Sequence, residues 1–388
     1  MNKTLLLLPG PVPVAQPVLE AMAWPMINHR GPEFAELLNR LERGLRPAFG
    51  TTGNVLVLGS SGTGGLEASV ANLFSPGDRL LSCPVGVFGK RLGDIARTYG
   101  CDVEVLETPL GAALDPAALR ARLERDGARA IRGILLTHNE TSTGVQNDMS
   151  AIAEVTRAHG SITVVDSVSG LGAAPFDMDA WGYDVVVTAS QKAFAVPPGL
   201  SMVAVRERAW EAMTRAKTPR FYFDLRKARD FSENGQTPWT PPVSICYALA
   251  VALERYHASG MAANFRRHAS YAHAVRAAFE ALGLTIFSRA NAHSVTVVAA
   301  TPPDGVDAAA LLKTLRERYG VVLSGGQGEL AGKIVRFGTM GDVSESDLLG
   351  AIASVERALD DSGANVSYGV GVAAAAEALT QSGTATVV

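Results

Sequence analysis

The chain of 388 residues is poor in cysteine and has no excess of charge of either sign. Its three cysteines, Cys83, Cys101 and Cys246, are an odd number and are scattered without the spacing of a metal site. We therefore expect buried, reduced thiols and a cytoplasmic location. With 35 Lys and Arg against 38 Asp and Glu, the net charge is −3, which argues against a surface built to bind nucleic acid or anionic lipid.

Long apolar runs and metal-binding histidine motifs are also missing. The longest uncharged apolar stretch, Val243–Leu253, is too short to cross a bilayer, so we expect no membrane span. The four leucines before Pro9 are too few for the apolar region of a secretory signal peptide. The seven histidines form no HExxH or comparable pattern, and we expect no catalytic metal.

What the chain does have is enough apolar sequence, 47% of its residues, for a large core, and enough length for two domains. Short apolar stretches typical of buried strands alternate with segments of helical spacing. The clearest strand candidates are residues 54–58, 133–137, 162–165, 184–188 and 201–205. Continuous apolar strands joined by helical segments predict an α/β sheet that is covered by helices on both faces.

The pattern changes near Tyr256. Beyond it the spacing predicts helices over 264–282 and 307–319, strands over 294–299 and 334–337, and a last helix that begins with the capping box Ser344-x-x-Asp347. This predicts a smaller α+β domain. We divide the chain into an N-terminal segment (1–14), a large domain (15–260), a small domain (261–360) and a C-terminal tail (361–388). The tail is rich in Ala, Gly, Ser and Thr, and we expect it to be loose or partly helical around 373–379.

The Gly-rich run from Gly59 to Gly65 lies between an apolar strand and a helical segment. Such a turn presents free backbone N–H groups at the positive end of the helix dipole, which suits a phosphate group. The run lacks the Gly-Lys-Ser/Thr of a P-loop, and Glu67 stands where the dinucleotide-binding pattern needs its third glycine. An ordinary tight turn uses the same residues, so this run alone leaves both interpretations open.

Two charged residues each follow an apolar strand. Asp166 comes directly after the strand around 162–165, where open α/β sheets place their ligand contacts. A turn-capping Asp would look the same. Lys192 lies just past the next strand, in a segment with no other charge between Asp184 and Val205. A desolvated lysine has a lowered pKa and can form a Schiff base with an aldehyde, although most lysines are solvated surface residues.

Together these three features fit one cofactor, pyridoxal 5'-phosphate (PLP). It needs a cradle for its phosphate, a lysine for its aldehyde, and an acid for its pyridine nitrogen.

Further stretches accompany these features in a fixed order and spacing. They are Pro9-Gly-Pro11, Asn28-His-Arg-Gly-Pro-Glu-Phe34, Ser61-Gly-Thr-Gly-Gly-Leu-Glu67, Gly86-Val-Phe-Gly-Lys-Arg91, Thr137-His-Asn-Glu-Thr-Ser-Thr-Gly144, Val165-Asp-Ser-Val168, Ser190-Gln-Lys192, Pro197-Pro-Gly199 and Arg336. Through them the chain resembles the class V aminotransferases of PLP fold type I, close to the serine/alanine–glyoxylate aminotransferase group. The resemblance implies a large α/β domain with a mostly parallel seven-stranded sheet flanked by helices, and a smaller α+β C-terminal domain.

The resemblance also implies roles for residues that bind the cofactor. Lys192 would hold PLP as a Schiff base and shuttle the substrate proton, and Asp166 would pair with the pyridinium nitrogen. Phe88 would stack on the ring, where many relatives have Trp. Further contacts to the ring and to the phosphate are implied for Thr141, Val168, Ser61, Gly62, Thr63 and Gln191.

Substrate and partner contacts are implied in the same way. Arg336 would bind the substrate carboxylate, and Gly10 would present its backbone to the same group. His29 and Arg30 are candidates for the substrate side chain, with a structural role as the alternative. Thr237 and Thr240 resemble the residues that contact the phosphate of the partner subunit, which implies a homodimer with shared active sites.

The function implied is transamination with ping-pong kinetics, in which an amino acid such as serine, alanine or aspartate gives its nitrogen to a 2-oxo acid such as glyoxylate or pyruvate. Phosphoserine is a further possible donor. A PLP lyase of the same fold is the alternative: a desulfurase needs a cysteine in the C-terminal domain, and none follows Cys246, whereas kynureninase-like cleavage stays open. The joint presence of Lys192 and Asp166 argues against a relative without catalytic activity.

Overall fold

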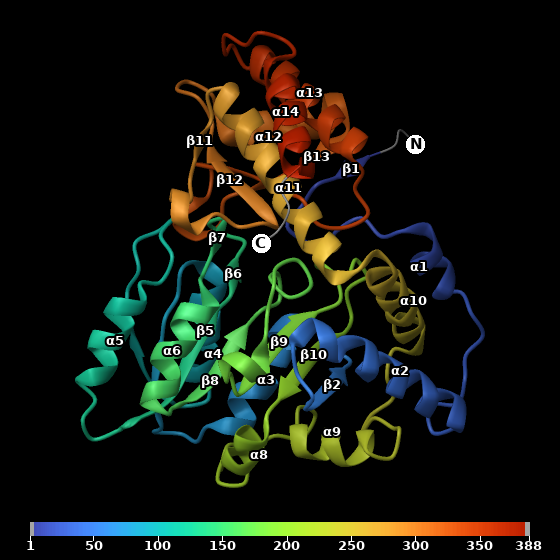
Figure 1. The fold of residues 1–388 in the computed structure, drawn as a ribbon, viewed down its shortest axis with the longest axis vertical. Coiled ribbons are helices and arrows are strands. Elements are labelled where there is room, and N and C mark those ends of the chain that lie inside the picture. Colours follow the sequence, from blue (N-terminus) through green and yellow to red (C-terminus); the bar gives the residue numbers. More distant parts are fainter. Residues whose placement is uncertain (1–3, 385–388) are drawn as a thin grey trace.

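The larger part of the chain is built on a seven-stranded sheet. The structure, a computed structural model, describes residues 4–384, and Figure 1 shows this sheet in the lower half of the molecule. Across the sheet the strands are β2 (Asn54–Leu58), β10 (Ser201–Val205), β9 (Val185–Ala189), β8 (Ile162–Asp166), β5 (Ile131–Thr137), β3 (Arg79–Ser82) and β4 (Asp102–Val105). Within it, β10 runs antiparallel to β2 and β9, and the other pairs are parallel. The predicted mostly parallel α/β sheet is confirmed.

Helices cover both faces of this sheet. The successive residues Val164 and Val165 of β8 belong to different apolar clusters on opposite faces, because neighbouring side chains of a strand point to opposite sides. The cluster around Val165 includes α2 (Pro32–Phe49), α5 (Pro116–Glu124), α6 (Met149–His159) and α10 (Val243–Ser259). The cluster around Val164 includes α3 (Gly62–Leu73), α4 (Val87–Thr98), α8 (Glu207–Met213) and α9 (Leu225–Ser232). Burial on both faces explains why the strand sequences are continuously apolar.

A smaller domain follows α10. Its four-stranded antiparallel sheet has the order β11 (Thr285–Ile286), β12 (Val297–Thr301), β15 (Val335–Gly338) and β14 (Ser324–Gly325). Its core is shared with α11 (Met261–Ala281), α12 (Ala308–Tyr319) and α13 (Glu345–Asp361). The strand predicted at 294–299 begins later, at Val297, because the hydroxyls of Ser294 and Thr296 both bond to the Asn139 side chain.

The N-terminal segment joins the small domain by strand pairing. Strand β1 (Leu5–Leu6) pairs in parallel with β13 (Val321–Val322), and the N–H of Gly338 donates to the carbonyl of Leu7. The chain then continues past Gly10 towards the large domain. Residues 1–3 of the predicted 1–14 segment lie outside the described residues.

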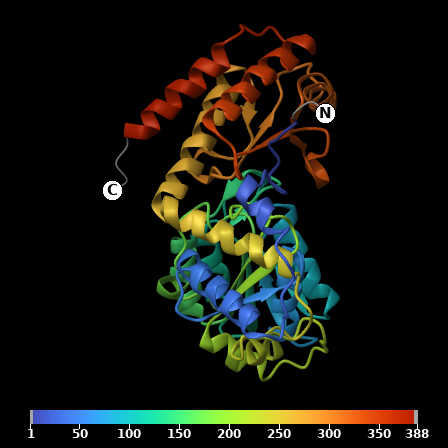
Figure 2. The same cartoon turned by 90° about the vertical axis from the view of Figure 1, so that its right-hand side faces the viewer.

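The C-terminal tail is more ordered than the sequence predicts. Residues Val370–Thr384 form α14, which packs along α11 with Ala375 and Ala378 buried (Figure 2). The buried carboxylate of Glu356 caps the start of this helix, because it accepts hydrogen bonds from the N–H groups of Gly369, Gly371 and Val372. Small alanine side chains allow close helix approach, so a sequence with few large apolar residues still packs. Residues 385–388 of the predicted tail lie outside the described residues.

The remaining elements are short. They are α1 (Gln16–Ala21), α7 (Met178–Trp181), the hairpin of β6 (Asn139–Glu140) and β7 (Val145–Gln146), and the 3-10 turns Ala290–Ala292 and Gly328–Leu330. No helix within residues 4–384 combines the length and apolar character that a membrane crossing needs.

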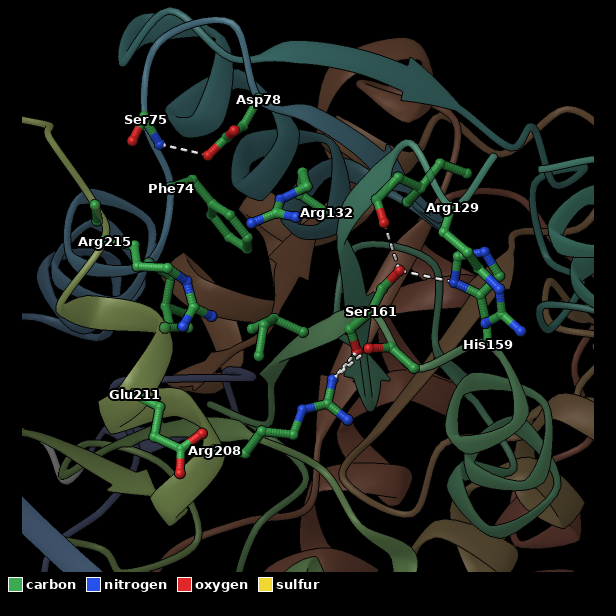
Figure 3. A pocket seen from close by; sticks show the side chains of 16 residues that line it. Phe74, Ser75, Asp78, Arg129, Arg132, His159, Ser161, Arg208, Glu211 and Arg215 are labelled. Atoms are coloured by element: carbon green, nitrogen blue, oxygen red, sulfur yellow. Dashed lines mark hydrogen bonds between the residues drawn. The ribbon is translucent and has the colours of Figure 1, made fainter. Parts of the chain in front are cut away.

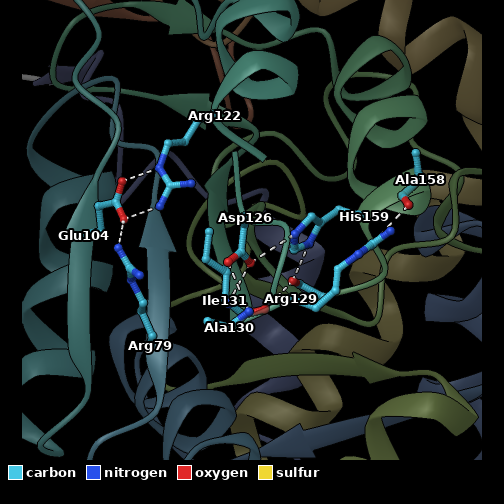
Figure 4. A network of polar contacts seen from close by, with 10 residues as sticks. Arg79, Glu104, Arg122, Asp126, Arg129, Ala130, Ile131, Ala158 and His159 are labelled. Atoms are coloured by element: carbon cyan, nitrogen blue, oxygen red, sulfur yellow. Dashed lines mark hydrogen bonds and ion pairs between the residues drawn. The ribbon is translucent and has the colours of Figure 1, made fainter. Parts of the chain in front are cut away.

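The edge of the large sheet is held by polar contacts (Figure 4). Glu104 of β4 pairs with Arg79 of β3 and with Arg122 of α5. Nearby, the carboxylate of Asp126 accepts from two backbone N–H groups and lies 3.2 Å from Nε2 of His159. These charged residues interrupt the apolar pattern of β3 and β4, which is why neither strand was predicted from the sequence.

Candidate active site

A cavity of about 190 Å³ lies at the carboxyl ends of the central strands. It is lined by ten residues singled out in the sequence: Gly10, Ser61, Gly62, Thr63, Phe88, Thr141, Asp166, Val168, Gln191 and Lys192. They come from six separate segments, and the parallel sheet brings them together because the carboxyl ends of its strands meet at one edge.

Lys192 lies in the loop after β9 and is buried, with 9% of its surface exposed. Its Nζ donates to the carbonyl oxygen of Pro9 at 2.7 Å. Burial lowers the pKa of Lys192 to about 8, while the charge of Asp166 opposes the shift and that of Arg336 adds to it. The lysine predicted to form a Schiff base is therefore partly neutral near neutral pH, as a nucleophilic amine must be.

Asp166 ends β8 and is 4% exposed. One of its carboxylate oxygens accepts from the N–H of Val168 at 3.0 Å. Burial raises the pKa of Asp166 to about 6; the Val168 hydrogen bond lowers it, Glu140 raises it, and Lys192 lowers it. Asp166 and Lys192 thus share one cavity as a pair of opposite charges, each in a desolvated position.

The Gly-rich run forms the start of α3. Ser61 is the N-cap and makes no side-chain cap, so the first N–H groups of this 12-residue helix stay open towards the cavity. A Cβ on Gly62 would lie 2.7 Å from a methyl group of Val168, so a larger residue there would push Val168 out of place. Oε1 of Gln191 is buried without a hydrogen-bond partner in the described structure. The open N–H donors at the helix start fit a phosphate. Oε1 of Gln191 is an acceptor and would pair with a donor, so only the Nε2 amide of this side chain can donate to a phosphate oxygen.

The aromatic wall of the cavity comes from the start of α4. Phe88 lines the cavity, and the guanidinium of Arg91 lies 4.7 Å from the centroid of its ring. Arg91 also donates to Oγ1 of Thr63 at 3.4 Å. A positive charge therefore lies between the aromatic wall and the helix start.

Arg336 of β15 lies next to this cavity and not in its lining. It is 5% exposed, and it donates from Nε to the carbonyl of Gly325 at 2.7 Å and from Nη1 to that of Thr141 at 2.8 Å. Both carbonyls orient the guanidinium, whose Nη2 has no partner among residues 4–384. That nitrogen is available to a carboxylate.

The other four predicted site residues lie outside the cavity and close to one another. Thr237 and Thr240 are in the loop after α9, where Oγ1 of Thr237 donates to the carbonyl of Trp239. The guanidinium of Arg30 donates to the Gln236 side chain and to the carbonyls of Thr237 and Pro238. Arg30 therefore holds the loop around Thr237 of its own chain. His29 is its neighbour in sequence.

A second, wider cavity of about 440 Å³ lies at the opposite, amino ends of the strands (Figure 3). Its rim carries four exposed arginines, Arg129, Arg132, Arg208 and Arg215. None of the residues singled out in the sequence lines it.

The sequence pattern of the Aminotransferase class-V family matches residues 19–338. The chain is a class-V aminotransferase. Its relatives include a protein of Synechococcus sp. named soluble hydrogenase, small subunit, which is 39% identical over 97% of this chain and 99% of its own length. They also include the L-aspartate–glyoxylate aminotransferase of Paracoccus denitrificans, 38% identical over 95% and 94%. Among solved structures, the pyridoxamine–pyruvate aminotransferase of Mesorhizobium loti superposes with a TM-score of 0.92 at 32% identity, over 98% of both chains.

This aminotransferase has site residues that sequence reasoning did not single out. Leu66, Arg91, Asn139 and Ser169 line the cavity beside the predicted residues. Asn139 and Arg91 stand inside motifs that carry the resemblance, so their sequence position was a usable signal. Ser169 was recognisable only in three dimensions, through its hydrogen bonds with the side chain and carbonyl of Asn139. In the described part of the aminotransferase, no three or more His, Cys, Asp or Glu side chains gather as a metal site.

Proposed function

We propose that this class-V aminotransferase binds PLP in the cavity at the carboxyl ends of its strands. Bound there, PLP supplies an aldehyde that takes up the amino group and a ring that accepts electrons. The single observation that carries the proposal is the shared burial of Lys192 and Asp166 in one cavity. The start of α3 and the side chain of Gln191 would hold the phosphate, and Phe88 and Val168 would cover the two faces of the ring.

The chain's own residues would move one proton. The amine Nζ of Lys192, with its pKa lowered by burial to about 8, has a neutral fraction at neutral pH that can bond to the aldehyde carbon. When it is not bonded to that carbon, the same nitrogen would accept the proton from the substrate Cα and deliver it to the carbon that carried the aldehyde. The carboxylate of Asp166 would keep a proton on the ring nitrogen, which makes the ring the better electron acceptor.

We propose a donor amino acid with a short side chain, namely serine, alanine or aspartate, and glyoxylate or pyruvate as acceptor. The cofactor and the substrate would share the cavity of about 190 Å³, which favours a small substrate. Arg336 would bind the α-carboxylate through Nη2, with Gly10 beside it. Two relatives are named for reactions with glyoxylate and with pyruvate, in agreement with these acceptors.

We propose a homodimer in which Thr237 and Thr240 contact the phosphate in the partner's cavity. Both lie on the surface of their own chain, outside its cavity, in a loop that Arg30 braces. His29 adjoins Arg30 in sequence, and we propose that it belongs to the same shared region. We also propose a cytoplasmic location, which agrees with three buried cysteines that form no disulfide.

A half-reaction screen tests the function. The PLP-loaded protein is mixed with one amino acid at a time, without an acceptor. The loss of the visible absorbance of the lysine-bound cofactor is followed together with release of a 2-oxo acid. We expect both signals in equal amounts with serine, alanine or aspartate. Release of ammonia or of a carbon fragment in place of the 2-oxo acid would show a lyase and contradict the proposal.

A further inference from the structure

A buried glutamate stands behind the aromatic wall of the active site. Glu140 belongs to the short strand β6 and has no exposed surface. Gly86 packs directly against it, because a Cβ on Gly86 would lie 2.5 Å from Cγ of Glu140. Glu140 does not line the cofactor cavity, and both of its oxygens are occupied by hydrogen bonds within the chain.

The two oxygens of this carboxylate bond to two different segments. Oε2 accepts from the N–H groups of Phe88 and Gly89, both at 3.0 Å. Oε1 accepts from the N–H of Ser142 at 3.0 Å and from its hydroxyl at 2.6 Å. Oγ of Ser142 in turn accepts from the N–H of Val87 at 2.9 Å. The first three N–H groups of α4 are therefore capped by a separate part of the chain.

This cap matters because the local sequence cannot supply one. The N-cap position of α4 is Gly86, which has no side chain. A carboxylate at a helix N-terminus also complements the helix dipole. All four donors point at acceptor-only oxygens, which fits an ionised carboxylate. Burial raises the pKa of Glu140, and its four hydrogen bonds oppose that shift.

The same carboxylate is also connected to the segment that holds Arg336. Thr141 lies between Glu140 and Ser142, and its carbonyl accepts from Nη1 of Arg336. One end of the carboxylate thus holds the backbone of Phe88, and the other holds the turn on which Arg336 rests. The side chain of Glu140 therefore connects the segment that carries Phe88 with the turn that orients the guanidinium of Arg336.

We propose that Glu140 is a positioning residue that sets the distance between the ring-stacking Phe88 and the carboxylate-binding Arg336. The inference rests on the proposed PLP site. If Glu140 has this role, the affinity for the cofactor and the affinity for the substrate should fall together when its carboxylate is lost. Both depend on the hydrogen bonds by which Glu140 joins the Phe88 segment to the turn that holds Arg336. The charge of Glu140 adds to this role, because it raises the pKa of both Asp166 and Lys192.

Glu140→Gln tests the proposal. In one orientation the NH₂ group of the amide faces the N–H groups of Phe88 and Gly89, and in the other it faces the N–H and the hydroxyl of Ser142. Either way it meets donors, so the hydrogen bonds of one half of the connection are lost. We expect the dissociation constant for PLP, measured by absorbance titration of the apo-protein, to rise about tenfold or more. The KM values for the amino acid and for the 2-oxo acid should rise by similar factors. Glu140→Asp keeps the charge and both acceptors and should recover part of each loss.

Glu356→Gln is the matched control. Glu356 is also a buried glutamate that caps a helix from a separate segment, but it lies in the small domain and far from the site in the fold. We expect it to lower the melting temperature and leave the PLP dissociation constant and both KM values unchanged. If Glu140→Gln also changes only the melting temperature, the role is structural and the proposal is wrong.

Two further results complete the test. If Glu140→Gln does not fold, Ser142→Ala replaces it, because it removes one arm of the same connection; unchanged PLP and substrate affinities in that variant would overturn the proposal. Failure of the proposed function itself has a different signature, since the unaltered protein would then bind no PLP at all.

Discussion

A cavity with charged residues lies at each end of the large sheet, and the two cavities differ in how far their charged side chains are buried. At the amino ends the cavity is the wider one, about 440 Å³, and its arginines are exposed. At the carboxyl ends it is about 190 Å³, with Lys192, Asp166 and, behind them, Glu140 all buried. Neither volume nor number of charges marks the reactive end. A buried lysine and a buried carboxylate that share one cavity do, because burial lowers the pKa of Lys192 towards the neutral amine that proton transfer needs while Asp166 lies beside it.

The largest difference between the two ends is expected in kcat, when Lys192 at the carboxyl ends is replaced. Lys192→Ala removes the amine that we propose bonds to the cofactor and moves the proton, and we expect kcat to fall by roughly 10⁴-fold or more. The exposed Lys217, near the amino ends, serves as control, and Lys217→Ala should keep full activity. Steady-state kinetics measures both. Normal turnover by the Lys192 variant would remove it from the mechanism.

A smaller loss is expected at Asp166. Asp166→Ala removes the charge that would hold a proton on the ring, and an interaction of this kind is worth roughly 10²–10³-fold in kcat. Asp184→Ala is the paired variant, because Asp184 is equally buried but lies at the amino end of β9, where it accepts from Thr163 and pairs with Arg208. It should reduce thermal stability and leave kcat and the cofactor spectrum unaltered. Equal kcat values for both variants would contradict the assignment.

The third effect is on substrate binding. Arg336→Lys keeps a positive charge but loses the planar fork, and we expect KM to rise about tenfold for both the amino acid and the 2-oxo acid. Arg208→Lys makes the same change at the amino ends, where the guanidinium donates to the carbonyls of Gly160 and Ser161. Initial-rate measurements should find its KM values unchanged. A rise in KM for one substrate alone would show that Arg336 does not hold the group that both share.

The burial of Lys192 also predicts a pH dependence. Its pKa is lowered to about 8, so about one tenth of the amine is neutral at pH 7 and nearly all of it at pH 9. The rate at which the apo-protein captures PLP covalently should therefore rise severalfold from pH 7 to 9. Stopped-flow absorbance would follow it. Because Asp166 raises the pKa of Lys192, the midpoint should move to lower pH in Asp166→Ala; an unmoved midpoint would show that the two charges are not coupled.

The smallest effect concerns the arginines at the amino ends. Arg132→Ala and Arg215→Ala remove exposed charges that make no ion pair within residues 4–384. We expect kcat/KM to stay within about twofold of the parent value. A larger change in either variant would mean that the two ends of the sheet are linked.

The sequence predicted the parts of the fold whose signal is local. The five strands with continuous apolar character were all found, because burial on both faces leaves that pattern. Strands β3 and β4 were missed, since Arg79, Asp102 and Glu104 belong to edge contacts that exist only after folding. Helix α14 was underestimated, because its alanines become buried only against α11.

The site was predictable to a similar degree. Lys192 and Asp166 stand at strand ends, where the topology alone points to ligand contacts. Ser169 and Glu140 form hydrogen bonds with partners that are distant in sequence, and no local pattern reveals such contacts. The hydrogen bond from Arg30 to the loop around Thr237 is another contact between distant residues that no local pattern reveals.

The pairing of β1 with β13 ties the pocket of the large domain to the folding of the small one. Pro9 and Gly10 lie against Lys192, and the strand just before them is held through Leu5 by Val321. Leu5 and Val321 are far apart in sequence, so the wall beside Lys192 is completed only after this long-range pairing has formed. A substitution that weakens the β1–β13 pair would therefore loosen the pocket without touching any residue that lines it.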